Sequence, residues 1–287
     1  MKIVNYIIAG IAVLALSVSC GRFAEFRVMS FNVRYDNPDD SLNNWDFRKD
    51  MAAMAVTVWD ADIVGTQEVL HNQLQDLQER LPNYNYIGVG REDGATQGEY
   101  SAIFYKAAKF EELSSGYFWL AENCDAVGAK GWDAVCERIA TWAVLKDLDS
   151  DKELFVLNTH LDHVGQVARR ESVSLIVEKI KELAGGRPVV MTGDFNAEPD
   201  SEVINHITGS SEGMPLLDSR KHAESIVRDA SGTFHAFGRI PEQRREYIDY
   251  IFVSPGVKVK TYEVLPEKLE GIYISDHNPI QAVIEIK

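Results

Sequence analysis

The sequence is poor in cysteine, has no surplus of basic residues and contains one long apolar run. Three cysteines in 287 residues are too few for a disulfide-stabilised scaffold. The formal net charge of −15 is the opposite of the basic surface with which proteins bind long nucleic acids. The sequence has no repeats or low-complexity stretches and 45% of its residues are hydrophobic, so we expect one large globular domain.

The long apolar run lies at the N-terminus and covers residues 7–16. It is shorter than the roughly 20 residues that a transmembrane helix needs, which favours a cleaved signal. Cys20 follows the small Ser19, as at a bacterial lipoprotein cleavage site, although Ser17 stands where such sites usually carry Leu. We expect residues 1–20 to be a lipoprotein-type signal peptide. A lipid on Cys20 would hold an exported protein in the cell envelope, in the periplasm or at the outer membrane, and plain secretion is the alternative.

The other two cysteines are Cys124 and Cys136. In an oxidising compartment two such thiols can form a disulfide if their Cα atoms lie within about 7 Å. Sequence leaves this pairing open. Neither cysteine has the spacing of a metal site.

Apolar periodicity predicts helices over residues 45–59 and 166–184, the second of which stops at Gly185-Gly186. A further helix after Glu68 carries leucines at three- to four-residue spacing. Short β-branched or aromatic runs between the helices predict strands. The expected strands cover residues 101–105, 141–145, 154–158, 188–192, 250–254, 257–265 and 280–286.

Polar clusters interrupt or end these apolar runs at six places. Carboxylate and carboxamide oxygens at strand ends are the hard ligands that Mg²⁺ prefers, and such sites leave coordination positions for water and phosphate. The clusters are Phe31-Asn32-Val33, Thr66-Gln67-Glu68, Asn158-Thr159-His160-Leu161-Asp162, Gly193-Asp194-Phe195-Asn196, Tyr247-Ile248-Asp249-Tyr250-Ile251 and Ile274-Ser275-Asp276-His277-Asn278-Pro279-Ile280.

These six clusters, in this order, resemble the endonuclease/exonuclease/phosphatase superfamily, which includes pancreatic deoxyribonuclease, deadenylases and inositol polyphosphate 5-phosphatases. The resemblance extends over nearly the whole mature chain, so residues 24–287 are expected to form the catalytic domain. It implies an α/β (α+β) fold, a four-layer αββα sandwich with two facing mixed β-sheets flanked by helices. Periodicity alone supports only a mixed α/β class.

The resemblance also implies a metal site. Glu68 corresponds to the principal metal ligand, Asn32 to a metal or phosphate contact, and Asp276 to a residue near the metal. The expected ion is Mg²⁺, with Mn²⁺ as a substitute. Arg34 stands where some abasic-site nucleases of the superfamily carry a further acidic metal contact, which argues against DNA repair and against a firmly held second metal.

Catalytic roles follow from the same resemblance. Asp194 orients or deprotonates the attacking water, and Asn196 steadies the pentacoordinate phosphate. Asp249 holds His277, and a carboxylate partner raises the pKa of an imidazole so that it can donate to the developing charge on phosphate. A Gly-Asp-X-Asn string is also a common turn, which is the structural alternative for the Asp194 cluster.

A second imidazole, His160, is expected to donate to a phosphate oxygen, with Glu99 as its partner carboxylate. Arg138 matches a phosphate-facing arginine of some relatives, and a surface salt bridge is its alternative. The roles of Asp162 and His163 stay open between catalysis and loop structure.

The expected substrate is a phosphate ester. The leading prediction is metal-dependent hydrolysis of phosphodiester bonds in nucleotides or single-stranded nucleic acid, and the acidic charge argues against long duplex DNA. The alternative is a phospholipid or inositol-phosphate head group, and a catalytically inactive binding module is a third hypothesis. Loops 210–215 and 231–246 are expected to set specificity, and we expect a monomer.

Overall fold

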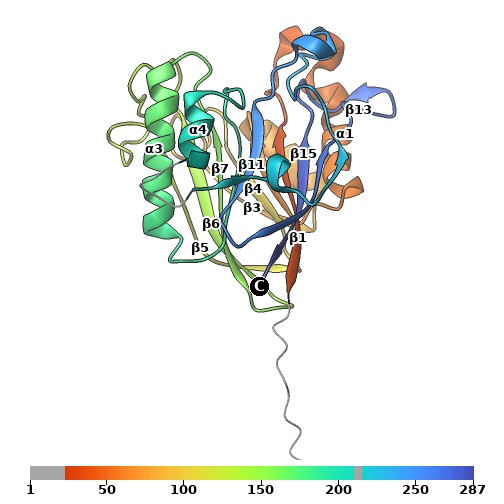
Figure 1. Cartoon of the computed structure of the whole chain (residues 1–287). Helices are drawn as coiled ribbons and strands as arrows, with labels where there is room; N and C mark the ends of the chain where they lie inside the picture. The colour runs from red at the N-terminus through yellow and green to blue at the C-terminus, as the bar shows by residue number, and fades with distance from the viewer. Residues whose placement is uncertain (1–22, 210–214) are drawn as a thin grey trace, which may run out of the picture.

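The computed structural model describes residues 23–209 and 215–287, in which two mixed β-sheets face each other (Figure 1). The predicted signal peptide and most of loop 210–215 lie outside the described residues. The first sheet has the order β10 (Ser225–Arg228), β12 (Lys258–Val264), β15 (Ile280–Ile286), β1 (Ala24–Asn32), β2 (Ile63–Gln67), β4 (Ile103–Lys106) and β3 (Tyr84–Ile87). The second has the order β5 (Phe110–Trp119), β6 (Ile139–Asp147), β7 (Glu153–His160), β8 (Val189–Asp194), β11 (Asp249–Val253) and β9 (Leu217–Asp218).

Helices cover the outer faces of both sheets, which confirms the four-layer αββα sandwich (Figure 1). The side chain of Asn44 caps the first long helix by accepting from the Asp46 N–H. Short elements complete the chain. The helices are α1 (Trp45–Val58) and α2 (His71–Arg80) on the first sheet and α3 (Gln166–Leu183) and α4 (Glu202–Gly209) on the second, and the short elements are η1 (Pro38–Asn43), α5 (Ser219–His222), η2 (Glu242–Arg244), β13 (Lys268–Leu269) and β14 (Ile272–Tyr273).

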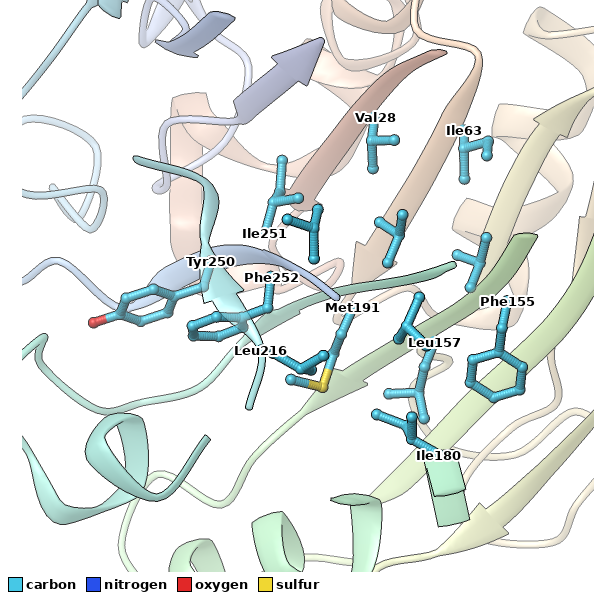
Figure 2. Packing of buried hydrophobic residues seen from close by; sticks show 14 of the residues in the cluster. Val28, Ile63, Phe155, Leu157, Ile180, Met191, Leu216, Tyr250, Ile251 and Phe252 are labelled. Carbon is cyan, nitrogen blue, oxygen red and sulfur yellow. The ribbon is translucent and has the colours of Figure 1, made fainter. Parts of the chain in front are cut away.

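The predicted helices and strands are confirmed, with boundaries that differ by a few residues. Figure 2 shows the core that the second sheet forms with α3, where Phe155, Leu157 and Met191 lie near Ile180. Val28 of β1 belongs to the same buried cluster. Among the described residues, no helix combines the length and the apolarity that crossing a bilayer requires.

The inner faces of the sheets change from apolar to polar along the strands. Alternate side chains of a strand point to one face. On β1 the inward series is Val28, Ser30 and Asn32, and all three are buried. The same change occurs on the neighbouring inner strands as Ile63, Gly65, Gln67 on β2; Val156, Asn158, His160 on β7; Val190, Thr192, Asp194 on β8; and Val253, Ile251, Asp249 on β11.

Midway along this series a polar contact joins the two sheets. Asn158 Nδ2 on β7 donates to the carbonyl oxygen of Thr66 at 2.8 Å on β2, and Asn158 Oδ1 accepts from Gln67 Nε2 at 2.7 Å. Gly65 faces it, and a Cβ there would lie 2.0 Å from Thr192 Oγ1. Asn158, predicted as part of a polar site cluster, therefore docks the sheets, and Gly65 provides the space.

Candidate active site

Strand register brings the predicted catalytic residues of the second sheet into one row. His160 at the end of β7 pairs with Asp194 at the end of β8, and Asp194 pairs with Asp249 at the start of β11. β11 runs antiparallel to β8, so its first residue meets the last residue of β8 at the same edge. The alternating pattern of each strand points all three side chains between the sheets.

Asp249 and His277 form a buried pair, with Asp249 Oδ2 and His277 Nδ1 2.8 Å apart. His277 Nε2 lies 3.8 Å from Asp194 Oδ2. Burial alone lowers the pKa of His277, but the carboxylates of Asp249, Asp194 and Asp276 raise it to about 10. The imidazole is therefore protonated at neutral pH, as the resemblance implied.

The pKa of Asp194 is also shifted, but here burial acts in the direction of the shift. Burial and the neighbouring Asp249 raise its pKa to about 7, against the lowering effects of His277 and of hydrogen bonds from the Asn196 N–H and the Asn32 amide. A carboxyl group with this pKa exchanges protons near neutral pH, as a general base must.

Asn32 holds the two acidic sides of the site together. Its Nδ2 donates to Glu68 Oε1 at 3.0 Å and to Asp194 Oδ2 at 2.9 Å, while its Oδ1 accepts from the Arg34 N–H at 2.9 Å. The amide oxygen is thus engaged by the backbone. Glu68 and Asp276 are better placed than Asn32 to offer oxygen to a metal.

Arg34 is a cation next to the acidic residues of the site. The sequence analysis noted it only because some relatives carry an acidic metal contact at its position. Its Nη1 lies 4.0 Å from Glu68 Oε2, and its Nε lies 3.8 Å from Asp276 Oδ2 and 2.9 Å from Asp40 Oδ2. Burial alone would raise the pKa of Glu68, but His277, the hydrogen bonds from Asn32 and the Tyr35 N–H, and Arg34 lower it.

Two carboxylates and a histidine of the site are spaced as ligands of a divalent cation. Ligand atoms of Glu68, His160 and Asp194 lie within 4.8 Å of one another. Burial and the neighbouring Glu68 raise the pKa of Asp276 despite the opposing effects of His277 and Arg34, so the protein alone does not fully compensate the buried negative charge. Hard oxygen donors and uncompensated negative charge together suit an ion such as Mg²⁺.

His160 lies on the other side of Asp194. Its Nε2 is 3.6 Å from Asp194 Oδ2 and 3.1 Å from Asn196 Nδ2. Burial, with the nearby Arg138 and Arg91, lowers the pKa of His160 well below 6.5, so this imidazole is neutral. Its expected partner Glu99 stands 3.9 Å from His160 Nδ1, beyond hydrogen-bond distance.

Glu99 instead pairs with Arg91, which sequence analysis missed. Arg91 Nη1 and Nη2 donate to the two oxygens of Glu99 at 2.6 and 2.9 Å. The loop between β3 and β4 carries both residues, and no motif around Arg91 distinguishes it from a surface arginine.

Arg138 faces the same space. It is 4% exposed, and its buried Nε and Nη1 make no hydrogen bond within the described part of the chain. Arg138 Nη2 lies 3.0 Å from His163 Nδ1. Asp162 accepts four backbone N–H groups, among them those of Val164 and Gly165. Asp162 therefore organises its loop and also forms an ion pair with Arg138, whose Nε lies 3.6 Å from Asp162 Oδ2. Nη1 is the Arg138 nitrogen that remains for an anionic oxygen.

Cys136 and Cys124 are free thiols as far as the described residues go, and Cys136 lies on the cavity wall. Three residues that line the cavity have a left-handed backbone, Arg34 with φ 60°, Glu68 with φ 61° and Asn196 with φ 46°. Such conformations are costly for residues other than Gly and gather at functional sites. In each case the turn comes just after a strand ends, and the side chain lines the cavity.

All these groups surround one cavity of about 440 Å³. Every predicted site residue lines this cavity except Asn32 and Asp249, which lie deeper. Tyr35, Arg91, Phe234 and Glu246 also line it and were not predicted as site residues, although Phe234 lies in the predicted specificity loop. Loop residues of this kind show no periodicity, so only the fold reveals them.

Fold and cavity together define a class of proteins, the hydrolases that act on phosphoester bonds. The model of the Endonuclease/Exonuclease/phosphatase family matches residues 29–277, and the chain belongs to this family. Members of the family are typically dependent on divalent metals.

Three similar proteins illustrate the range of the family. A solved endonuclease/exonuclease/phosphatase from Bacteroides vulgatus is 50% identical, with a TM-score of 0.89 over 92% of this chain and 100% of its own. A mannosyl-6-phosphatase from Bacteroides thetaiotaomicron is 40% identical, with a TM-score of 0.84 over 90% of this chain and 99% of its own. Nocturnin from Drosophila melanogaster is 27% identical over 256 residues, which are 78% of this chain and 38% of that protein.

Proposed function

We propose that this protein is a divalent-metal-dependent phosphatase that releases phosphate from a small sugar monophosphate. The observation that carries the proposal is the cavity, whose 440 Å³ lie at the small end of the range for ligand sites and whose walls are mainly charged. Such a site suits one phosphate joined to one polyhydroxylated ring. The 40% identity to a mannosyl-6-phosphatase over 90% of the chain supports the same substrate class.

The proposed roles of the residues follow their positions. Glu68 and Asp276 would hold the metal, with Asn32 fixing Glu68, and the bound ion would supply charge neutralisation at the phosphate. Asp194 orients and deprotonates the water. The His277 imidazolium, held by Asp249, donates to a phosphate oxygen.

The remaining polar groups would bind the phosphate. Asn196 contacts its oxygens beside the neutral His160, which donates through one N–H. Arg138 supplies its Nη1, and Glu99 acts through its pair with Arg91. Mg²⁺ is the proposed ion, with Mn²⁺ as a substitute.

The predicted cleavage of nucleotides or single-stranded nucleic acid has less support from the geometry. Loop 231–246 was expected to offer aromatic rings and arginines to a base and its phosphate. Only Phe234 and Glu246 of this loop line the cavity. His235 and Phe237 are buried behind it, and Arg239 and Arg244 are exposed outside its lining.

We also propose that the protein is exported to the cell envelope and anchored there through Cys20. Such an anchor argues against a lipid of the bilayer as the substrate. β1 runs from Ala24 to Asn32, a span of about 26 Å at about 3.3 Å per residue. Figure 1 shows the start of β1 at one end of the sheets, and Asn32 lies at the other. The cavity would thus open away from the membrane, towards soluble or polymer-linked sugar phosphates.

Two assays test the proposal, the release of inorganic phosphate from the monophosphates and the shortening of the strand on a gel for the oligonucleotide, whose cleavage leaves the phosphate on the product. The substrates are mannose 6-phosphate, myo-inositol 1-phosphate and a single-stranded oligonucleotide, each with Mg²⁺, Mn²⁺ or EDTA. We expect mannose 6-phosphate to react fastest, EDTA to abolish the reaction and Asp194→Asn to lower kcat by about 10²–10⁴-fold. The exposed Asp200→Asn is the matched control. Oligonucleotide cleavage without sugar phosphate hydrolysis would reject the sugar assignment in favour of the nuclease prediction.

A further inference from the structure

One wall of the cavity is built from a backbone layer that joins Glu246 to the catalytic histidine. Phe234 pairs in antiparallel bridges with Glu246 on one side and with His277 on the other. The N–H groups of Thr233 and Phe234 donate to the carbonyl oxygen of Glu246 at 2.8 and 3.0 Å. Bridged residues have Cα atoms about 4.5–5.5 Å apart, so Glu246 is held about 10 Å from the His277 backbone.

The Glu246 side chain differs from the other carboxylates of the cavity. Glu68, Asp194 and Asp276 form the candidate metal and water site, and Glu99 is paired with Arg91. Within residues 23–209 and 215–287, no hydrogen bond or ion pair engages the carboxylate of Glu246, which lies on the wall next to the Phe234 ring. That ring packs against His277 with centroids 4.9 Å apart.

We infer that Glu246 selects the leaving group by charge, admitting neutral polyhydroxylated groups and rejecting those that carry a second negative charge. This inference rests on the proposed function, because it assigns the leaving-group side of the same site. A carboxylate accepts hydrogen bonds from hydroxyl groups, which a sugar ring provides. It repels a second phosphate or carboxylate, and because Glu246 is exposed, solvent weakens this repulsion so that it changes affinity by about threefold.

The consequence is a distinction between substrates that share the same reacting phosphate. The leaving group of a sugar monophosphate carries no charge and can bind beside Glu246. Sugar bisphosphates and nucleic acid carry further phosphates beside the reacting one, and Glu246 repels them. The selection is local, and it operates in addition to the overall charge of −15.

The experiment compares kcat/KM for two substrate pairs that differ in leaving-group charge. One pair is mannose 6-phosphate and mannose 1,6-bisphosphate, and the other is phenyl phosphate and 4-carboxyphenyl phosphate. The protein is assayed as wild type, as Glu246→Gln, which keeps the shape and removes the charge, and as Glu242→Gln. Glu242 is exposed on the same loop and does not line the cavity, so it is the matched control.

We expect wild type and Glu242→Gln to prefer the substrate with the neutral leaving group in both pairs, and Glu246→Gln to reduce that preference by about threefold. An unchanged preference in Glu246→Gln, or equal rates for both members in wild type, overturns the inference. If mannose 6-phosphate is not hydrolysed but the aryl preference still falls in Glu246→Gln, the sugar assignment is wrong and the charge selection holds.

Discussion

At the scale of single residues, the chemistry depends on two buried groups with shifted pKa values. Asp194 must lose a proton to act as a base, and its pKa is raised to about 7 by burial and Asp249. His277 must keep its proton, and its pKa is about 10 because Asp249 and the other carboxylates outweigh burial. Activity should therefore rise with pH through about 7 and fall through about 10.

The Asp249→Asn variant tests this assignment. Removing the carboxylate that most strongly raises the pKa of His277 should move the alkaline limb of the kcat profile to lower pH and reduce the maximum rate. The same change lowers the pKa of Asp194, so the acidic limb should also move down. The measurement is kcat against pH at saturating metal. An alkaline limb that stays where wild type has it would show that His277 is not the titrating acid.

At the scale of elements, the sequence predicts the helices and strands that have an apolar face and a residue that ends them. The apolar stripe of α3 ends at Gly185 and Gly186, which have φ values of 58° and 79°. β5 was missed because it is an edge strand whose middle residues are exposed, so the segment has no alternating apolar pattern. β5 forms as a strand because it pairs with β6 along its length, and the local sequence alone does not indicate this pairing.

Gly186 provides a prediction about helix termination. No atom lies within 4 Å of a Cβ placed there, so Gly186→Ala acts only through its left-handed backbone. The free energy of unfolding should fall by about 1–2 kcal/mol, measured by urea denaturation. Gly209→Ala is the control, because this helical position has equal space and no positive φ, and it should gain up to about 1 kcal/mol. Equal effects at both positions would contradict the backbone argument.

At the scale of the whole molecule, the two sheets are held in register by a polar contact inside an apolar interface. Asn158→Leu removes the partner of the Thr66 carbonyl and of Gln67, and each buried polar group left unpaired costs about 1–3 kcal/mol. We expect the free energy of unfolding to fall by at least about 2 kcal/mol in chemical denaturation. The exposed Asn85→Leu is the control and should change it by less than about 0.5 kcal/mol.

The charge of the whole molecule gives a prediction about partners. With a net charge of −15, the protein has no general attraction for a phosphate backbone. Fluorescence anisotropy with labelled duplex DNA at physiological salt should detect no binding, and lowering the salt should not restore it. Salt-dependent binding of duplex DNA would reveal a local basic surface and contradict this expectation.

The sequence by itself determined the polar residues that end the apolar strands, because period-two alternation and strand length are local properties. Asn32, Glu68, His160, Asp194 and Asp249 could all be identified on that basis with the family resemblance. Only the tertiary structure decided that Glu99 pairs with Arg91, that Asn158 joins the sheets, and that Glu246 lies on the cavity wall without a partner in the described part of the chain. These facts arise where segments distant in sequence meet, and hydrogen-bond partners and burial exist only once the sheets have packed.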